Sequence, residues 1–109
     1  MVQDRGNSNN EVNSIDAINK VIHEPARLLI ISHLYVLESA DFVFLRAQTG
    51  LTWGNLSSHI SKLEEAGYVS VQKEFIMKKP HTMVSLTQEG RIAFEQYRKE
   101  MKNLLEKKA

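Results

Sequence analysis

The segment from Thr49 to Val69 restricts the possible folds of this chain more than any other, because it contains a turn, a capped helix and the start of a strand. Thr52 is a favourable N-cap, and Gly67 is a typical residue for ending a helix. Tyr68 then opens a run that is typical of a strand. This order predicts a short helix presented between a tight turn and a strand.

The helix expected from Trp53 to Ala66 has an apolar and a polar face. Leucine and isoleucine recur at four- and three-residue spacing, which is typical of one buried stripe: Leu56, Ile60 and Leu63. At about 100° per residue, the opposite side carries small and polar side chains, namely Asn55, Ser58 and Lys62 with Gly54 and Ser61 beside them. This polar face is free to contact another molecule.

Length and composition favour one globular domain, expected over residues 13–109. The chain has 109 residues, of which 42% are hydrophobic, and this is enough for a modest core. It has no cysteine, which excludes disulfides and thiolate metal sites. The longest apolar run, Leu28 to Ile31, is too short to span a bilayer, and no signal peptide is recognisable. We therefore expect a cytoplasmic protein.

The net charge of +1 hides an uneven distribution along the chain. Residues 1–24 contain two basic and four acidic groups (−2), residues 25–68 three and four (−1), and residues 69–109 nine and five (+4). The excess of positive charge is C-terminal. A local basic patch is compatible with this pattern, and so is an ordinary solvated helix.

The N-terminal part reads as a tail followed by three helices. Residues 1–12 are polar without apolar periodicity, so we expect a disordered tail. Ser14 can cap a helix that ends near Glu24. Pro25 suits the first turn of a second, buried helix that continues to Glu38. A brief third helix is expected from Phe42 to Gln48.

The C-terminal part reads as a hairpin and a long helix. Alternation from Val69 to Met77 predicts one strand and Met83 to Leu86 a second, with Lys78 to His81 as a basic turn. Thr87 can cap a last helix that runs to about Lys107. The expected order is H-H-H-H-E-E-H, mainly α with a small β-hairpin (α+β).

This order is the layout of a winged helix-turn-helix. The turn would be Thr49 to Thr52, the reading helix Trp53 to Ala66, and the wing Val69 to Leu86. The major groove of DNA is about 12 Å wide and admits one helix, while a hairpin with lysines can lie on the neighbouring backbone or minor groove. Duplex DNA is therefore the expected partner.

Three segments in this order resemble the winged-helix transcriptional regulators related to the MarR and ArsR groups, in particular small archaeal and bacterial winged-helix DNA-binding domains. The segments are HEPARLLIISHL (23–34), ADFVFLRAQTGLTWGNLSSHISKLEEAGYV (40–69) and KKPHTMVSLTQEGRIAF (78–94). The resemblance covers about residues 15–105. Its motifs are more specific for the fold than for the function.

The resemblance implies which residues approach DNA. Those at the major groove would be Thr52, Gly54, Asn55, Ser57, Ser58, His59 and Lys62, and those of the wing Lys73, Lys78, Lys79, His81 and Thr82. The basic ones would mostly bind phosphate. The wing turn departs from the family pattern, because it has Lys-Lys-Pro in place of an Arg-bearing tip, which leaves deep minor-groove insertion without support.

Asn55 is the best single candidate for reading a base, because its amide can pair bidentately with adenine. An ordinary solvated helix surface is the alternative for Asn55 and Ser58. We favour the DNA-reading interpretation, because such a surface would be expected to use Glu, Lys and Ala.

The histidines and the tryptophan have simpler interpretations than a metal or ligand site. No two of the four histidines have the three- or four-residue spacing that places two ligands on one helix face, so we expect no metal and no cofactor. His81 would add a pH-dependent charge to the wing. Trp53 precedes Leu56 by one turn and is interpreted as a partly buried anchor.

The last helix carries an apolar seam at three- and four-residue intervals: Phe94, Tyr97, Met101 and Leu104. Within one chain, the first helix could cover this seam with Ile15, Ile18 and Ile22. The family resemblance implies instead that the first and last helices of two copies pack together. We expect a homodimer, which would place two reading helices about 34 Å apart on a palindrome.

We therefore expect a homodimeric, sequence-specific transcriptional regulator rather than an enzyme. The alternative is a winged helix used only for protein contacts. No Ser/His/Asp arrangement, Gly-rich phosphate loop or carboxylate cluster supports catalysis. The sequence identifies neither an operator nor a small-molecule effector.

Overall fold

The structure is a computed structural model that describes residues 15–106. The tail expected over residues 1–12 and the cap expected at Ser14 lie outside the described residues. In chain order the elements are η2 (Ile15–Ala17), α1 (Pro25–Leu37), β2 (Ser39–Asp41), α2 (Phe42–Thr49), α3 (Trp53–Glu65), β3 (Val69–Ile76), β4 (Lys79–Leu86) and α4 (Gln88–Leu105). The expected fold class, a winged helix-turn-helix with mainly α structure, is confirmed.

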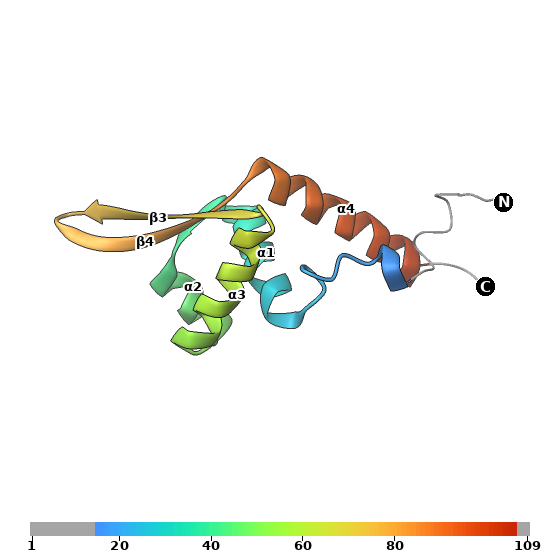
Figure 1. Cartoon of the computed structure of the whole chain (residues 1–109), viewed down its shortest axis with the longest axis horizontal. Helices are drawn as coiled ribbons and strands as arrows, with labels where there is room; N and C mark the ends of the chain where they lie inside the picture. The colour runs from blue at the N-terminus through green and yellow to red at the C-terminus, as the bar shows by residue number, and fades with distance from the viewer. Residues whose placement is uncertain (1–14, 107–109) are drawn as a thin grey trace.

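Helix α1 is the centre of the fold, and it contacts the other three α-helices and the sheet. Ile30, Ile31 and Leu34 are fully buried on it, and each such side chain stabilises the fold by about 1.5–3 kcal/mol. Pro25 begins the helix, and the Glu24 side chain accepts a hydrogen bond from the Arg27 backbone N–H at 2.8 Å. Figure 1 shows the β3–β4 hairpin extending beyond the helices at one end, with α4 running toward the other.

The helix expected from Ser14 to Glu24 is wrong in length, because only the 3₁₀ turn η2 forms there. Asn19 explains the break. Its side-chain oxygen accepts hydrogen bonds from the backbone N–H groups of Val21 and Ile22 at 3.0 and 3.1 Å. Such a local bond offers the backbone an alternative to the helix.

The residues between η2 and α1 are nevertheless tied to distant parts of the chain. The Asn19 amide donates to the hydroxyl of Tyr68 at 3.0 Å. A hydrogen bond of 2.7 Å joins Nδ1 of His23 to the hydroxyl of Tyr97 on α4. Ile22 is fully buried in the core.

The sheet has three antiparallel strands in the order β2-β4-β3. Strand β2 was not expected, because Ser39-Ala40-Asp41 reads as a polar break when its partner is unknown. Ala40 is buried and pairs with Val84. Long-range pairing therefore decides the structure of this short segment.

The wing hairpin also differs from the expected one at its tip. Strand β4 begins at Lys79, so the loop is Met77-Lys78 rather than Lys78 to His81. Pro80 lies inside the strand, opposite Phe75. A proline is tolerated there because β2 pairs only with the other end of β4 and leaves this part of the strand at an edge.

The junction between the wing and α4 depends on a glycine, because there is no room for a side chain at this position. Gly90 is buried in the first turn of α4, and a Cβ added to it would lie 2.1 Å from the carbonyl oxygen of Tyr68. The Thr87 hydroxyl donates to the carbonyl of Gly67 at 2.6 Å and accepts from the Gly90 N–H at 2.9 Å. The base of the wing is thereby fixed to the start of α4.

Asp41 connects the wing to α2. Its carboxylate accepts a hydrogen bond from the Val43 backbone N–H at 2.7 Å, which caps α2. It also contacts Nδ1 of His81 on β4, and because an ionised carboxylate can only accept, His81 is the donor. The His81 hydrogen bond, and after it the one from Val43, lower the pKa of Asp41 below its ordinary value of 3.8 against the opposing effect of burial.

We expect Gly90→Ala to lower the free energy of unfolding by about 3 kcal/mol, because the added methyl group collides with backbone that cannot rotate away. Urea denaturation followed by circular dichroism measures this. Gly54→Ala is the matched control: a Cβ there meets no described atom within 4 Å apart from the adjacent residues and backbone of α3, so this change should stabilise α3 by about 0.5 kcal/mol. Equal stability of the two variants would contradict the close packing at Gly90.

We expect Asp41→Ala to lower the free energy of unfolding at neutral pH by about 1–2 kcal/mol, because it removes both the α2 cap and the partner of His81. Asp41→Asn keeps the cap and should lose less. Since the folded-state pKa of Asp41 is lowered, its charge stabilises the fold above about pH 4 and ceases to do so as the pH falls through that pKa. The free energy of unfolding of Asp41→Asn relative to the wild type can be measured by urea denaturation from pH 7 to pH 2. The difference should shrink as the pH falls through the pKa of Asp41. A deficit that is independent of pH would contradict this role.

Candidate nucleic-acid interface

Helix α3 presents the polar face expected from the sequence. Thr52 caps it by accepting a hydrogen bond from the Asn55 backbone N–H at 3.1 Å. The apolar stripe of the helix is buried, as expected: Leu56, Ile60 and Leu63. The candidate residues of the opposite side are exposed: Gly54, Asn55, Ser57, Ser58 and Lys62.

A cleft of about 250 Å³ separates α3 from the wing. Ser57 of α3 and Thr82 of β4 both line it, so the structure brings these two candidate residues together. Lys73 pairs with Thr82 across the hairpin and is exposed. One surface therefore runs from α3 through the cleft onto the wing.

The other side of α3 is tied to the start of α1 by His59, which is half-buried. The Arg27 guanidinium is always protonated, so it donates to Nδ1 of His59 at 3.2 Å. Its Nε also donates to the carbonyl of Val21 at 2.5 Å. Glu24 lies 3.7 Å from the same ring nitrogen. His59 therefore supports α3 from the side rather than standing free for DNA.

The charge of Glu24 adds to this cluster. Burial by itself would raise the pKa of Glu24, but hydrogen bonding from the Arg27 backbone, the neighbouring His59 ring and the charge of Arg27 outweigh it and lower the pKa. An adjacent cavity of about 400 Å³ is lined by Lys20, Arg27, Lys62 and Glu65 among others. Positive side chains thus flank the His59 edge of α3.

The lysines of the wing are available for contact. Lys73, Lys78 and Lys79 are exposed, and none of them forms an ion pair with another residue in the described range. His81 differs from them, because its ring is half-buried and engaged by Asp41. The charge expected from His81 is therefore located beside α2 and not at the tip.

Arg46 is a candidate that the sequence analysis missed. Trp53 is 48% exposed at the start of α3 and stacks on Phe42 of α2, with ring centroids 5.7 Å apart. The Arg46 guanidinium lies 5.0 Å from the Trp53 ring centroid. Trp53 is an anchor, as interpreted, but it lies at the surface. The four-residue spacing of Phe42 and Arg46 places them on one face of α2, and this signal could have identified the pair.

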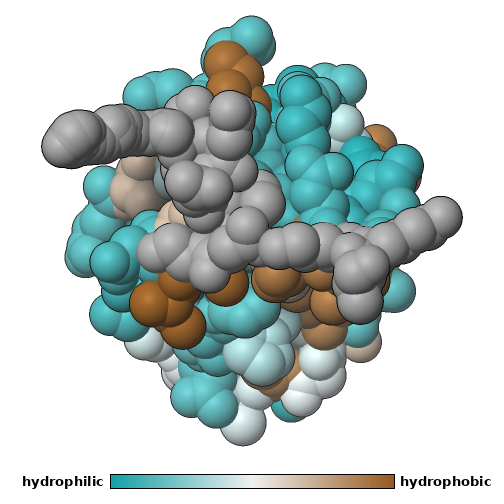
Figure 2. All heavy atoms as spheres, turned by 90° about the vertical axis from the view of Figure 1, so that its right-hand side faces the viewer, coloured by the Kyte–Doolittle hydropathy of each residue, from teal (hydrophilic) through white to brown (hydrophobic). Residues whose placement is uncertain are grey.

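The residues proposed for dimer contacts fall into two groups. Ile22, Phe94 and Tyr97 are buried within one chain, so they have almost no surface left for a second copy. Ile15 is exposed, and the remaining three are half-buried: Ile18, Met101 and Leu104. Figure 2 looks at the end of the molecule toward which α4 runs and shows hydrophobic residues among hydrophilic ones there.

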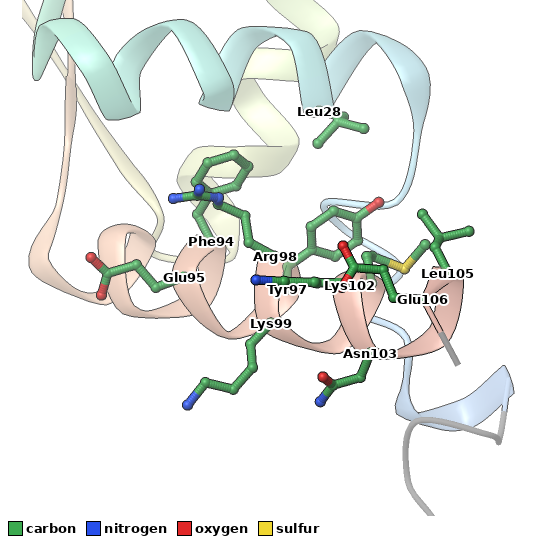
Figure 3. Close-up of a pocket in the computed structure, with 11 residues that line it drawn as sticks. Leu28, Phe94, Glu95, Tyr97, Arg98, Lys99, Lys102, Asn103, Leu105 and Glu106 are labelled. Carbon is green, nitrogen blue, oxygen red and sulfur yellow. The ribbon is translucent and has the colours of Figure 1, made fainter. Parts of the chain in front are cut away.

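A groove of about 710 Å³ runs along α4 beside α1 (Figure 3). Phe94 and Tyr97 point from α4 toward α1, where Leu28 faces the groove. Met101 and Leu105 continue its apolar lining, and Arg98 and Lys102 add charge. The apolar strip of α4 is thus only partly covered by its own chain.

Other kinds of site find little support in residues 15–106. No group of three or more metal-ligating side chains in this range could hold a metal ion. No helix of the described residues is long and apolar enough to cross a membrane.

Comparison with known proteins gives a family match over most of the chain. Residues 26–105 match the model of the winged helix DNA-binding domain. The uncharacterized protein MJ0432 of Methanocaldococcus jannaschii is 38% identical over 78 residues, which cover 72% of this chain and 85% of that protein.

Solved structures agree with this match. The transcriptional regulator homologue from Pyrococcus horikoshii OT3 has a TM-score of 0.77 and 29% identity, over 87% of this chain and 90% of that one. YusO from Bacillus subtilis (TM-score 0.69, 19% identity, 89% and 66% covered) and NadR in complex with 4-hydroxyphenylacetate (0.63, 23%, 77% and 62%) share the fold. The resemblance to winged-helix DNA-binding domains is confirmed, and the chain belongs to the winged helix DNA-binding domain family.

Proposed function

We propose that this protein is a transcriptional regulator that binds duplex DNA sequence-specifically, with α3 in the major groove and the wing on the adjacent backbone or minor groove. The observation that carries the proposal is the exposed face of α3, where Gly54, Asn55 and Ser58 leave a narrow, polar surface. Short side chains allow the helix to approach base edges closely, and Asn55 can pair with adenine.

The charges around this face support a polyanionic partner. Lys62 lies on α3, Arg46 lies beside its start, and three further lysines, Lys73, Lys78 and Lys79, are exposed on the wing. The first turn of α3 contains no acidic residue, so the positive end of its helix dipole is uncompensated. These groups would bind phosphates and orient α3 without reading sequence.

The protein acts as a homodimer in this proposal, with α4 and η2 of two copies in contact. Leu105 is 76% exposed and Ile15 74% exposed, so both present apolar surface to water. Met101 and Leu104 are half-buried beside them. A second copy would remove this apolar surface from water and supply the second reading helix of a palindromic site.

The DNA-binding proposal predicts a change in tryptophan fluorescence. Trp53 is the single tryptophan of the chain, so titration with duplexes selected from a random pool should perturb its emission directly. Asn55→Ala should weaken binding by about 1–3 kcal/mol and relax the preference at one base pair. Lys62→Gln should weaken binding to all sequences and reduce the slope of log K against log salt by about 1.

Lys99→Gln is the matched control, because Lys99 is an exposed cation on α4 away from α3. It should leave both affinity and salt slope unchanged. The proposal is wrong if the wild-type chain binds no duplex at low salt. It is also wrong if Asn55→Ala and Lys62→Gln bind as tightly as the wild type, which would favour a role in protein contacts.

The dimer proposal predicts that a charge on the end of α4 separates the copies. Leu105→Glu should raise the dissociation constant of self-association at least about tenfold, because burial of a leucine contributes about 1.5–3 kcal/mol. Sedimentation equilibrium measures this. Val36→Glu is the control, since Val36 is an equally exposed apolar residue on α1. A wild-type chain that stays monomeric on palindromic DNA would refute the dimer.

A further inference from the structure

The tip of the wing carries three apolar side chains that lie outside the hydrophobic core. Met77 is 90% exposed and Phe75 78% exposed, while Ile76 between them is 41% exposed. Hairpin tips normally carry polar turn residues. Within residues 15–106, none of these three residues belongs to the hydrophobic core or packs against it. Figure 1 shows the tip of the hairpin extending beyond the helices.

The backbone at this tip is strained as well. Met77 has φ of 52° and Lys78 φ of 67°, and both lie in the left-handed region. A two-residue loop of this kind is best served by Asn and Gly, whereas a long side chain with φ above zero is unfavourable. Because the side chain of Met77 gains no burial in return, the strain points to a contact outside the chain.

The direction of the tip follows from strand register. The pairs that share the core-facing side of the hairpin are, moving outward, Val71 with Val84, Lys73 with Thr82 and Phe75 with Pro80. Val71 and Thr82 line the cleft with Ser57 of α3. Phe75 therefore lies farther out on the side of the wing that α3 occupies, and DNA held by α3 would continue along this side.

The length of the wing matches the spacing of the grooves. The five residue steps from Val71 to Ile76 span about 17 Å at about 3.4 Å per residue. Half a turn of duplex, which separates the centre of the major groove from the next minor groove, is also about 17 Å. A minor groove about 6 Å wide excludes a helix but admits a narrow turn. The tip and the flanking minor groove would therefore coincide.

We propose that the wing tip is an apolar wedge for the minor groove: Met77 enters between two base pairs and Phe75 packs on the sugars beside it. Exposed lysines at the tip, Lys78 and Lys79, bind the phosphates on both sides of the groove. Insertion of an apolar side chain unstacks a base step and bends the duplex toward the major groove. The inference rests on the proposed function, because α3 must first hold the duplex.

The test uses duplexes that the wild-type chain selects, with 2-aminopurine at successive positions of the flanking minor groove. Unstacking raises the fluorescence of this base, and energy transfer between dyes at the two ends reports the bend. The wild type and the control Met77→Leu should raise the signal at one step and bend the duplex. Met77→Asn should abolish both and weaken binding about tenfold, while its melting temperature rises because Asn suits φ above zero.

Weaker binding together with a higher melting temperature distinguishes a wedge from a structural role. If Met77 had a structural role, Met77→Asn would lower both the stability and the affinity. The wedge is refuted if the 2-aminopurine fluorescence rises at no base step. It is also refuted if Met77→Asn raises this fluorescence and bends the duplex as much as the wild type does. If duplex binding that depends on Asn55 persists in that case, the proposed function stands without the wedge. If the wild type binds no duplex, both fail. If Met77→Asn abolishes only self-association, the tip is a contact between copies and the wedge is wrong.

Discussion

The contact between Gly90 and the carbonyl of Tyr68 is the constraint on which both ends of the molecule depend. It allows α4 to begin directly against the chain that enters the wing, and Thr87 closes the same junction through Gly67. The wing extends from one side of this junction and α4 from the other. A side chain at position 90 would therefore disturb the surface proposed for DNA and the surface proposed for a second copy at once.

The sequence predicted those elements whose signals are local. Thr52 and Gly67 bound α3 as expected, and the stripe of Leu56, Ile60 and Leu63 is buried. The errors occur where a distant or competing bond decides the structure. Asn19 diverts the backbone before α1, and β2 exists only because Ala40 finds Val84 more than forty residues away. Single-sequence periodicity contains neither piece of information.

The candidate site was predictable to the extent that it lies on one helix. Exposure of Asn55, Ser58 and Lys62 follows from the 3.6-residue repeat of α3. The intramolecular contacts of His59 and His81 do not follow from this repeat, because their partners Arg27 and Asp41 belong to other elements. The sequence shows that Arg46 shares a face of α2 with Phe42, but the position of Arg46 over Trp53 depends on how α2 and α3 pack.

The bonds of the segment before α1 have a consequence for the geometry of any paired assembly. Asn19 and His23 join this segment to the entry of the wing and to α4, and Arg27 joins it to α3. If α4 pairs two copies, these bonds leave the pairing helix α4 and the reading helix α3 little freedom to move relative to each other. One added base pair rotates one half-site by about 35° relative to the other. Such a stiff connection cannot follow that rotation, so the two copies would read their half-sites only at a fixed helical phase.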